Sequence, residues 1–260
     1  MSVVSNYVLP FDLDGPANKP TRRQSGVASS DVVLSAHVAD NAAVFPAVLA
    51  LHVPRGSVVA DITYGTGVFW RDMKTSDYTL LPTDLKLGQS WDHLPHEDGS
   101  VDAVVFDPPY MEGLYRRSTR AMAGSGTHAA FRGFYSDGTP QADAVERKYH
   151  DAVLQAYLSV VPEVKRILRA DGSFIVKCQD EVSANRQKLT HVELIWAYEH
   201  QGFYCKDLFV VVRRNTPIVS RLVRQEHARK NHSYFLVFQR QDHRKRLHYS
   251  NFSDWLRGNP

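Results

Sequence analysis

The stretch VDAVVFDPPY, residues 101–110, joins an apolar run to an acid, two prolines and an aromatic ring. Residues 101–106 are rich in Val, show no helical spacing and are too few for a helix, so they predict a buried β-strand. The prolines end the strand because they fix φ and donate no backbone hydrogen bond. We therefore expect Asp107 and Tyr110 in a rigid turn at the carboxyl end of that strand.

Apolar runs on both sides predict further strands, over residues 57–62, 79–83, 173–178, 208–213 and 234–239. Helical patterns cover residues 41–52, 144–170 and 190–201. Pro46 is expected in the first turn of the first helix, and Pro162 is expected to kink or split the second. Alternating strands and helices predict an α/β fold, a mainly parallel sheet with helices on both faces. The last two strands are expected to be antiparallel neighbours.

The remaining segments carry little regular pattern. Residues 1–40 predict an irregular N-terminal arm, rich in Pro, Ser and Asn at its start. Residues 41–240 predict the catalytic domain, and 111–143 is an insertion long enough to be functional, a candidate target-recognition loop. Residues 241–260 form a basic tail.

Bulk composition sets broad limits. Hydrophobic residues make up 43% of the 260, as in globular proteins, and no window approaches the length of a membrane span. The formal charge of +3 is too small to imply nucleic acid, although arginines cluster locally, as at Arg213-Arg214. The two cysteines, Cys178 and Cys205, form no metal-ligand pattern, so we expect no metal, a reducing compartment and a cytoplasmic protein.

The segment ADITYGTG, residues 60–67, predicts a ligand loop between a strand and a helix N-terminus. Gly65 and Gly67 would let the backbone approach a ligand closely. Asp61 would repel a phosphate and favours a cationic ligand such as S-adenosylmethionine, which carries an ammonium and a sulfonium. Asp84 follows the next strand, where an acid commonly accepts hydrogen bonds from ribose hydroxyls.

The DPPY turn suits a base that has been flipped out of a nucleic acid. Asp107 can accept one proton of an exocyclic amino group, and the carbonyl of Pro108 can accept the other. This draws the nitrogen lone pair out of conjugation and aims it at a methyl donor. Tyr110 can stack on the base face.

With these motifs the chain resembles the S-adenosylmethionine-dependent amino-methyltransferases that modify DNA at adenine N6 or cytosine N4. DPPY matches their catalytic signature, VADITYGTG their cofactor loop, and LRADGSFIVKCQ and HARKNHSYFLVFQR later elements. The resemblance implies a Rossmann-like class I methyltransferase fold with a seven-stranded sheet, and the catalytic residues Asp107, Pro108, Pro109 and Tyr110. The cofactor-binding residues it implies are Phe45, Pro46, Asp61, Thr63, Gly65, Gly67, Asp84, Leu85 and Asp107.

The resemblance implies DNA as the partner, and Asp at the first position of DPPY favours adenine N6. Cytosine N4, an RNA base and a non-catalytic subunit remain alternatives, and a homo-oligomer is left open. Cytosine-C5 chemistry needs a thiolate, and neither cysteine follows a proline at a strand end. A zinc deaminase needs a His and Cys ligand set that the sequence does not offer.

Overall fold

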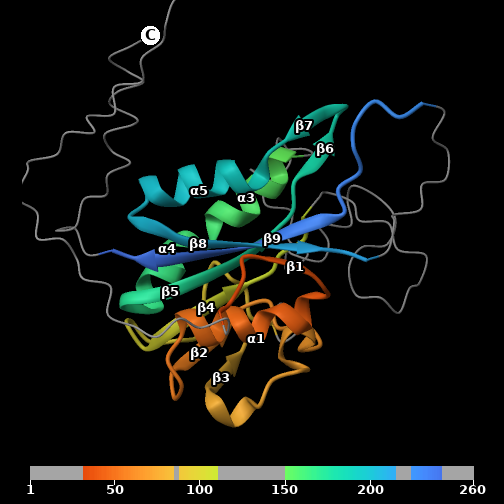
Figure 1. Cartoon of the computed structure of the whole chain (residues 1–260). Coiled ribbons are helices and arrows are strands. Elements are labelled where there is room, and N and C mark those ends of the chain that lie inside the picture. Colours follow the sequence, from red (N-terminus) through yellow and green to blue (C-terminus); the bar gives the residue numbers. More distant parts are fainter. Residues whose placement is uncertain (1–31, 85–87, 111–149, 215–223, 242–260) are drawn as a thin grey trace, which may run out of the picture. The chain divides into compact units, whose positions relative to one another are not determined.

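The computed structural model describes residues 32–84, 88–110, 150–214 and 224–241 (Figure 1). The chain divides after Val32, and the helices and strands below belong to the unit that begins at Val33. The strands are β1 (Ala36–Val38), β2 (Val58–Asp61), β3 (Thr79–Pro82), β4 (Val101–Phe106), β5 (Leu168–Cys178), β6 (Glu181–Ser183), β7 (Arg186–Lys188), β8 (Phe203–Val212) and β9 (His232–Arg240). The α-helices are α1 (Asn41–His52), α3 (His150–Ser159), α4 (Val161–Ile167) and α5 (Thr190–His200), and two 3₁₀ helices are η1 (Val68–Trp70) and η2 (Thr75–Asp77).

Seven strands form one sheet in the order β1-β8-β9-β5-β4-β2-β3. β9 is antiparallel to both of its neighbours, β5 and β8. The other neighbouring pairs are parallel. The predicted α/β fold, a mainly parallel seven-stranded sheet of the Rossmann-like methyltransferase type, is therefore confirmed, as is the antiparallel pairing of the last two strands.

Helices cover both faces of this sheet, with α1 on one side and α3, α4 and α5 on the other (Figure 1). Strand β4 shows why both faces are apolar. Ala103 and Val105 pack in the core on the α1 side, whereas Val104 and Phe106 pack in the core on the opposite side. A strand buried on both faces loses the alternation of polar and apolar residues, which is the pattern read from VDAVVF.

Several boundaries differ from the sequence prediction. Residues 36–38, inside the segment expected to be irregular, form β1 and pair in parallel with β8. Strand β5 begins at Leu168 rather than at residue 173, with a shift in its pairing with β4 before the regular pairing starts. Asp171 lies in this early part with φ of 60°. Pro162 does split the predicted helix, because α3 ends at Ser159 and α4 begins at Val161.

Two local predictions were wrong. Pro46 lies in the second turn of α1, since the helix starts at Asn41 after the N-cap Asp40, whose side chain accepts a 2.9 Å hydrogen bond from the amide of Ala43. The glycine loop is followed only by the three-residue η1, not by an α-helix. The next residues, Val68, Phe69 and Trp70, are β-branched or aromatic, and such side chains are weak helix formers.

The parallel direction of β2, β3, β4 and β5 brings their carboxyl ends to one edge of the sheet. Because β9 runs the other way, its amino end reaches the same edge, with Tyr234 paired opposite Cys178. We call this the carboxyl edge. The predicted DPPY turn, glycine loop and Asp84 all follow strands that end there.

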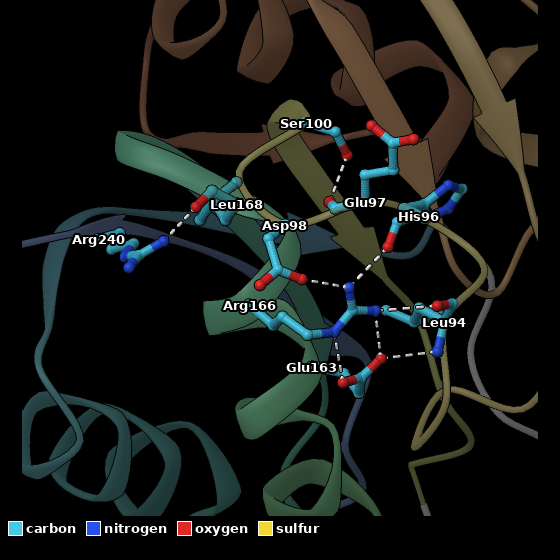
Figure 2. A network of polar contacts seen from close by, with 9 residues as sticks. All are labelled: Leu94, His96, Glu97, Asp98, Ser100, Glu163, Arg166, Leu168 and Arg240. Carbon is cyan, nitrogen blue, oxygen red and sulfur yellow. Dashed lines mark hydrogen bonds and ion pairs between the residues drawn. The ribbon is translucent and has the colours of Figure 1, made fainter.

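The opposite edge is held by Arg166 of α4 (Figure 2). Its guanidinium donates to the carbonyls of Leu94 and His96 at 2.9 and 2.7 Å, and to Asp98 and Glu163 at 2.8 and 2.7 Å. Glu163 in turn accepts the amide of Leu94 at 2.8 Å. These hydrogen bonds from Arg166 are the main cause that lowers the pKa of Glu163, to about 2. The network fixes the loop that leads into β4.

Candidate active site

The glycine loop after β2 is folded by its own residues. Gly65 and Gly67 have φ of 56° and 69°, a region that other residues rarely adopt. A Cβ on Gly67 would lie 2.6 Å from the hydroxyl oxygen of Tyr64, so a larger residue there would displace that ring. The amide of Tyr64 donates to the carbonyl of Thr83 at 3.2 Å. The loop is thus held against the segment after β3.

Asp61, at the end of β2, fixes the start of the glycine loop through two hydrogen bonds. Its Oδ2 accepts the indole N–H of Trp70 at 2.7 Å, and its Oδ1 accepts the amide of Thr63 at 3.1 Å. Only 3% of Asp61 is exposed, and this burial raises its pKa to about 7, against the effect of the two hydrogen bonds. Asp107 and Asp84 raise the pKa further, since each adds a negative charge nearby. The edge therefore concentrates acid groups.

Asp84 braces the same loop from the neighbouring strand. Its Oδ2 accepts the amide of Gly65 at 2.8 Å, so β3 delivers an acid to the glycine turn as the sequence predicts. The predicted contact of Asp84 with ribose stays a prediction. Leu85 lies outside the described residues.

The DPPY turn follows β4 directly. The amide of Asp107 donates to Oγ1 of Thr63 at 2.6 Å, and the hydroxyl of Tyr110 donates to Oδ1 of Asp107 at 2.6 Å. Burial raises the pKa of Asp107 to about 6, while Tyr110, Lys177 and Arg213 lower it. Among the described residues, neither Oδ2 of Asp107 nor the carbonyl of Pro108 has a hydrogen-bond partner. Two neighbouring acceptors of the turn are thus without a partner in the described part of the chain.

Lys177 is a residue of this site that the sequence analysis did not single out. It follows Val176, the register partner of Phe106, and so lies beside Asp107. Its side chain is 1% exposed; Nζ donates to Ser233 Oγ at 2.5 Å and lies 4.5 Å from the centre of the Phe235 ring. Burial lowers its pKa to about 8, and the charge of Asp107 raises it. A lysine within the apolar run SFIVKC was the signal that could have found it.

A second polar cluster lies next to Lys177 at the carboxyl edge. Asp180 Oδ1 is 2.7 Å from Nδ1 of His191, and its Oδ2 accepts the hydroxyl of Tyr234 at 3.3 Å. The rings of His191 and Tyr234 stack with centroids 4.2 Å apart. His232 Nε2 lies 2.9 Å from the Tyr234 hydroxyl. This cluster joins β5, α5 and β9 beside the DPPY turn.

The predicted cofactor residues Phe45 and Pro46 lie on α1, beneath the loop. Phe45 is fully buried, with its ring centre 5.1 Å from that of Phe69 and 5.2 Å from that of Trp70. Since Trp70 holds Asp61, Phe45 supports the glycine loop through the core. Contact of Phe45 or Pro46 with a cofactor stays a prediction.

Neither cysteine has the surroundings of a nucleophile. Cys178 is fully buried and burial raises the pKa of its thiol strongly. Burial also raises the pKa of Cys205, to about 12. A thiol mechanism would need the opposite shift. Within the described residues, no group of His, Cys, Asp and Glu could hold a metal ion, and no helix is long and apolar enough to cross a membrane.

The sequence matches one protein-family model, described as DNA methylase and covering N6 and N4 methyltransferases, over residues 101–257. The match spans more than half of the chain and includes β4 and the DPPY turn. The chain belongs to this DNA methylase family. It is a methyltransferase that uses S-adenosylmethionine, as its family does, and the acids around the glycine loop suit that cationic cofactor. No curated protein matches the sequence.

Three solved structures are similar to parts of this DNA methylase. A candidate DNA modification methylase from Thermus thermophilus, complexed with S-adenosyl-L-methionine, is 16% identical, with a TM-score of 0.33 over 64% of this chain and 61% of that one. The PvuII cytosine-N4-specific DNA methyltransferase is 15% identical, with a TM-score of 0.37 over 58% and 46%. A methyltransferase from Aquifex aeolicus is 11% identical, with a TM-score of 0.40 over 75% and 88%. The chain thus spans less than two thirds of the first two.

Proposed function

We propose that this DNA methylase transfers a methyl group to N6 of adenine in DNA, on a base flipped out of the duplex. The observation that carries the proposal is the pair of acceptors in the DPPY turn, Asp107 Oδ2 and the Pro108 carbonyl, beside an acid-lined glycine loop. An exocyclic amino group has two protons to donate, which is what this pair accepts. Asp rather than Ser at the first position supports adenine over cytosine.

The residues divide into two groups in this mechanism. Asp61, Asp84 and the glycine loop would hold S-adenosylmethionine, which supplies an electrophilic methyl carbon when bound. Asp107 and the Pro108 carbonyl orient the amino nitrogen, and Tyr110 stacks on the base. The nitrogen would gain the methyl group as the methyl–sulfur bond breaks and leaves its electron pair on sulfur, and it would lose one proton, which the Asp107 carboxylate would accept and pass to water. Orientation and electrostatics then supply most of the rate, and no covalent enzyme intermediate forms.

The proton role requires Asp107 as a carboxylate. A pKa of about 6 leaves it mostly ionised at neutral pH and still basic enough to take a proton from a methylated amino group. Tyr110 donates to Oδ1, and leaves Oδ2 for the substrate. The carboxylate is therefore charged and keeps one oxygen for a hydrogen bond from the substrate.

The experiment combines substrate choice with identification of the base. The purified chain is incubated with radiolabelled S-adenosylmethionine and duplex DNA, single-stranded DNA or RNA, and the product is digested to nucleosides and weighed by mass spectrometry. N6-methyladenine in DNA, abolished in Asp107→Ala with circular dichroism unchanged, is the expected result. If the product is N4-methylcytosine, the target base is cytosine and not adenine. If methyl transfer occurs only to RNA, the proposed substrate is wrong. Normal transfer by Asp107→Ala would reject the mechanism.

A further inference from the structure

The β6–β7 hairpin and the segment 224–231 before β9 lie against each other beyond the end of β5 (Figure 1). Asn185 at the hairpin tip donates to Glu226 at 3.0 Å, and its carbonyl is 3.2 Å from Nε2 of His227. Gln179, just after β5, donates to the carbonyl of Lys230 at 3.2 Å. The two segments are thus joined to each other and to the end of a strand at the carboxyl edge.

The β6–β7 hairpin is fixed at its tip and at its base. Its tip is a two-residue turn in which Ala184 and Asn185 have φ of 48° and 57°, the signature of the tight turns that suit hairpin twist. Its base is anchored by Glu181, whose Oε1 is 2.8 Å from Nδ1 of the buried His150. Side chains on β6 and β7 are therefore held in place rather than carried on a loose loop.

These segments, together with Arg213 just after β8, present basic side chains at the carboxyl edge. We define the basic rim as Arg186, Lys188, Arg213, Arg224, Arg229 and Lys230, all exposed or half-exposed. Arg213 connects the rim to the site, because its amide donates to the carbonyl of Asn231 at 2.7 Å and its charge lowers the pKa of Asp107. The exposed acid among these segments is Glu226, which already accepts a hydrogen bond from the side-chain amide of Asn185.

The rim lacks the counter-ions that four other arginines of the described fold have, a lack that it shares with Arg214 and Arg240. Arg55, Arg71, Arg166 and Arg169 each form an ion pair with an aspartate or glutamate, and Figure 2 shows the most elaborate case, around Arg166. Within the described residues, no member of the basic rim forms an ion pair. Six like charges repel one another, and a polyanion that neutralises them would bind by releasing its own counter-ions.

We propose that the basic rim binds the phosphates of duplex DNA that flank the target base. This inference rests on the proposed function and adds the surface that would position the DNA on the enzyme. Phosphate contacts fix register without reading sequence. Binding through the rim is therefore expected to be independent of sequence and strongly dependent on salt.

The test is the salt dependence of DNA binding by the full chain, measured by fluorescence anisotropy on a labelled duplex of arbitrary sequence. The variants are Arg186→Gln/Lys188→Gln on the hairpin and Arg224→Gln/Arg229→Gln on the adjoining segment. Each lost phosphate contact reduces the slope of log K against log salt by about 0.9, so each double variant should reduce it by about 2. Arg186→Lys/Arg224→Lys should keep the wild-type slope, since a phosphate needs only the charge.

Arg55→Gln is the matched control, an exposed arginine with a long 3.8 Å ion pair away from the rim, and its slope should be unchanged. If both glutamine variants keep the wild-type slope, the basic rim does not bind DNA phosphates, even if the chain methylates DNA. The rim would be supported, whatever base is modified, if the glutamine variants have reduced slopes while Asp107→Ala binds the duplex as tightly as wild type. Binding of RNA but not duplex DNA would overturn both the partner and the proposed function.

Discussion

Thr63 of the glycine loop accepts the backbone amide of Asp107 through its hydroxyl, over 2.6 Å. This hydrogen bond spans from the end of β2 to the end of β4 and ties the cofactor loop to the catalytic turn. The position of the carboxylate relative to the loop therefore depends on one side-chain oxygen.

We expect Thr63→Val to lower kcat about tenfold and to cost roughly 1–3 kcal/mol of stability, because the amide of Asp107 would be buried without a partner. Thr63→Ser should restore both, since it keeps the hydroxyl. Single-turnover methyl transfer and urea unfolding measure the two effects. A Thr63→Val enzyme with wild-type kcat would show that the DPPY turn keeps its position without this hydrogen bond.

Tyr110 has two separable roles, the ring and the hydroxyl. Tyr110→Ala should weaken the transition state by about 1–3 kcal/mol, a loss of roughly 5- to 150-fold in kcat/KM, because the base loses its stacking surface. Tyr110→Phe should keep the stacking. It should instead move the acid limb of the pH–rate profile to higher pH, since the hydroxyl lowers the pKa of Asp107. Equal effects of both variants would contradict a stacking role.

Lys177 should contribute to the lower pH limit of activity. Asp107 works as a carboxylate, so activity should fall below about pH 6. Removing the ammonium in Lys177→Met should raise that limit, because Lys177 lowers the pKa of Asp107; Arg213 and Tyr110 lower it too and remain in place. Lys177→Arg should bring the limit back toward wild type. A lower kcat with an unshifted limb in Lys177→Met would mean a purely structural lysine.

Asp61 should make the fold less stable as pH rises. Its pKa is about 7 in the fold against an ordinary value of 3.8, so the folded state holds an extra proton between these values. Stability is therefore lost as pH rises from about 4 to 7, by up to about 4 kcal/mol for roughly three pKa units. In Asp61→Asn this part of the pH dependence should vanish. Urea unfolding of both proteins at several pH values between about 5 and about 8 measures the free energy of unfolding. The same pH dependence in both proteins would show that Asp61 is not its cause.

Ala184 offers a stability test of the hairpin that carries the rim. Its φ of 48° costs a residue with a Cβ about 1 kcal/mol or more, whereas glycine adopts it freely. Ala184→Gly should therefore slow amide hydrogen exchange in β6 and β7 and leave kcat unchanged. Faster exchange in the hairpin would show that the strain is relieved elsewhere.

Much of the fold could be predicted from local pattern, and the exceptions have physical causes. Strands buried on both faces, such as VDAVVF, have an unmistakable apolar run, and the acids at their ends mark one edge. β1 has three residues, AHV, and β6 and β7 are as short, so their formation depends on pairing partners rather than on their own composition.

The sequence predicted those site residues that lie together in one motif. It did not predict those that different strands bring together. Asp107 and Tyr110 are neighbours in sequence, and their hydrogen bond follows from the turn. Lys177 and Ser233 are 56 residues apart, and only the antiparallel insertion of β9 next to β5 joins them. Leu85 and the segment 111–143 lie outside the described residues, and the roles predicted for them stay predictions.

The last strand of the described residues, β9, lies in the middle of the sheet, between β5 and β8. A ribosome must therefore finish nearly the whole described fold before those two strands find their partner. Until then both expose unpaired backbone edges along apolar runs, FIV in β5 and LFVVV in β8, which are templates for intermolecular pairing. A chain that stops before β9 should consequently be lost to aggregation during synthesis, and should not persist in the cell as a soluble but inactive enzyme.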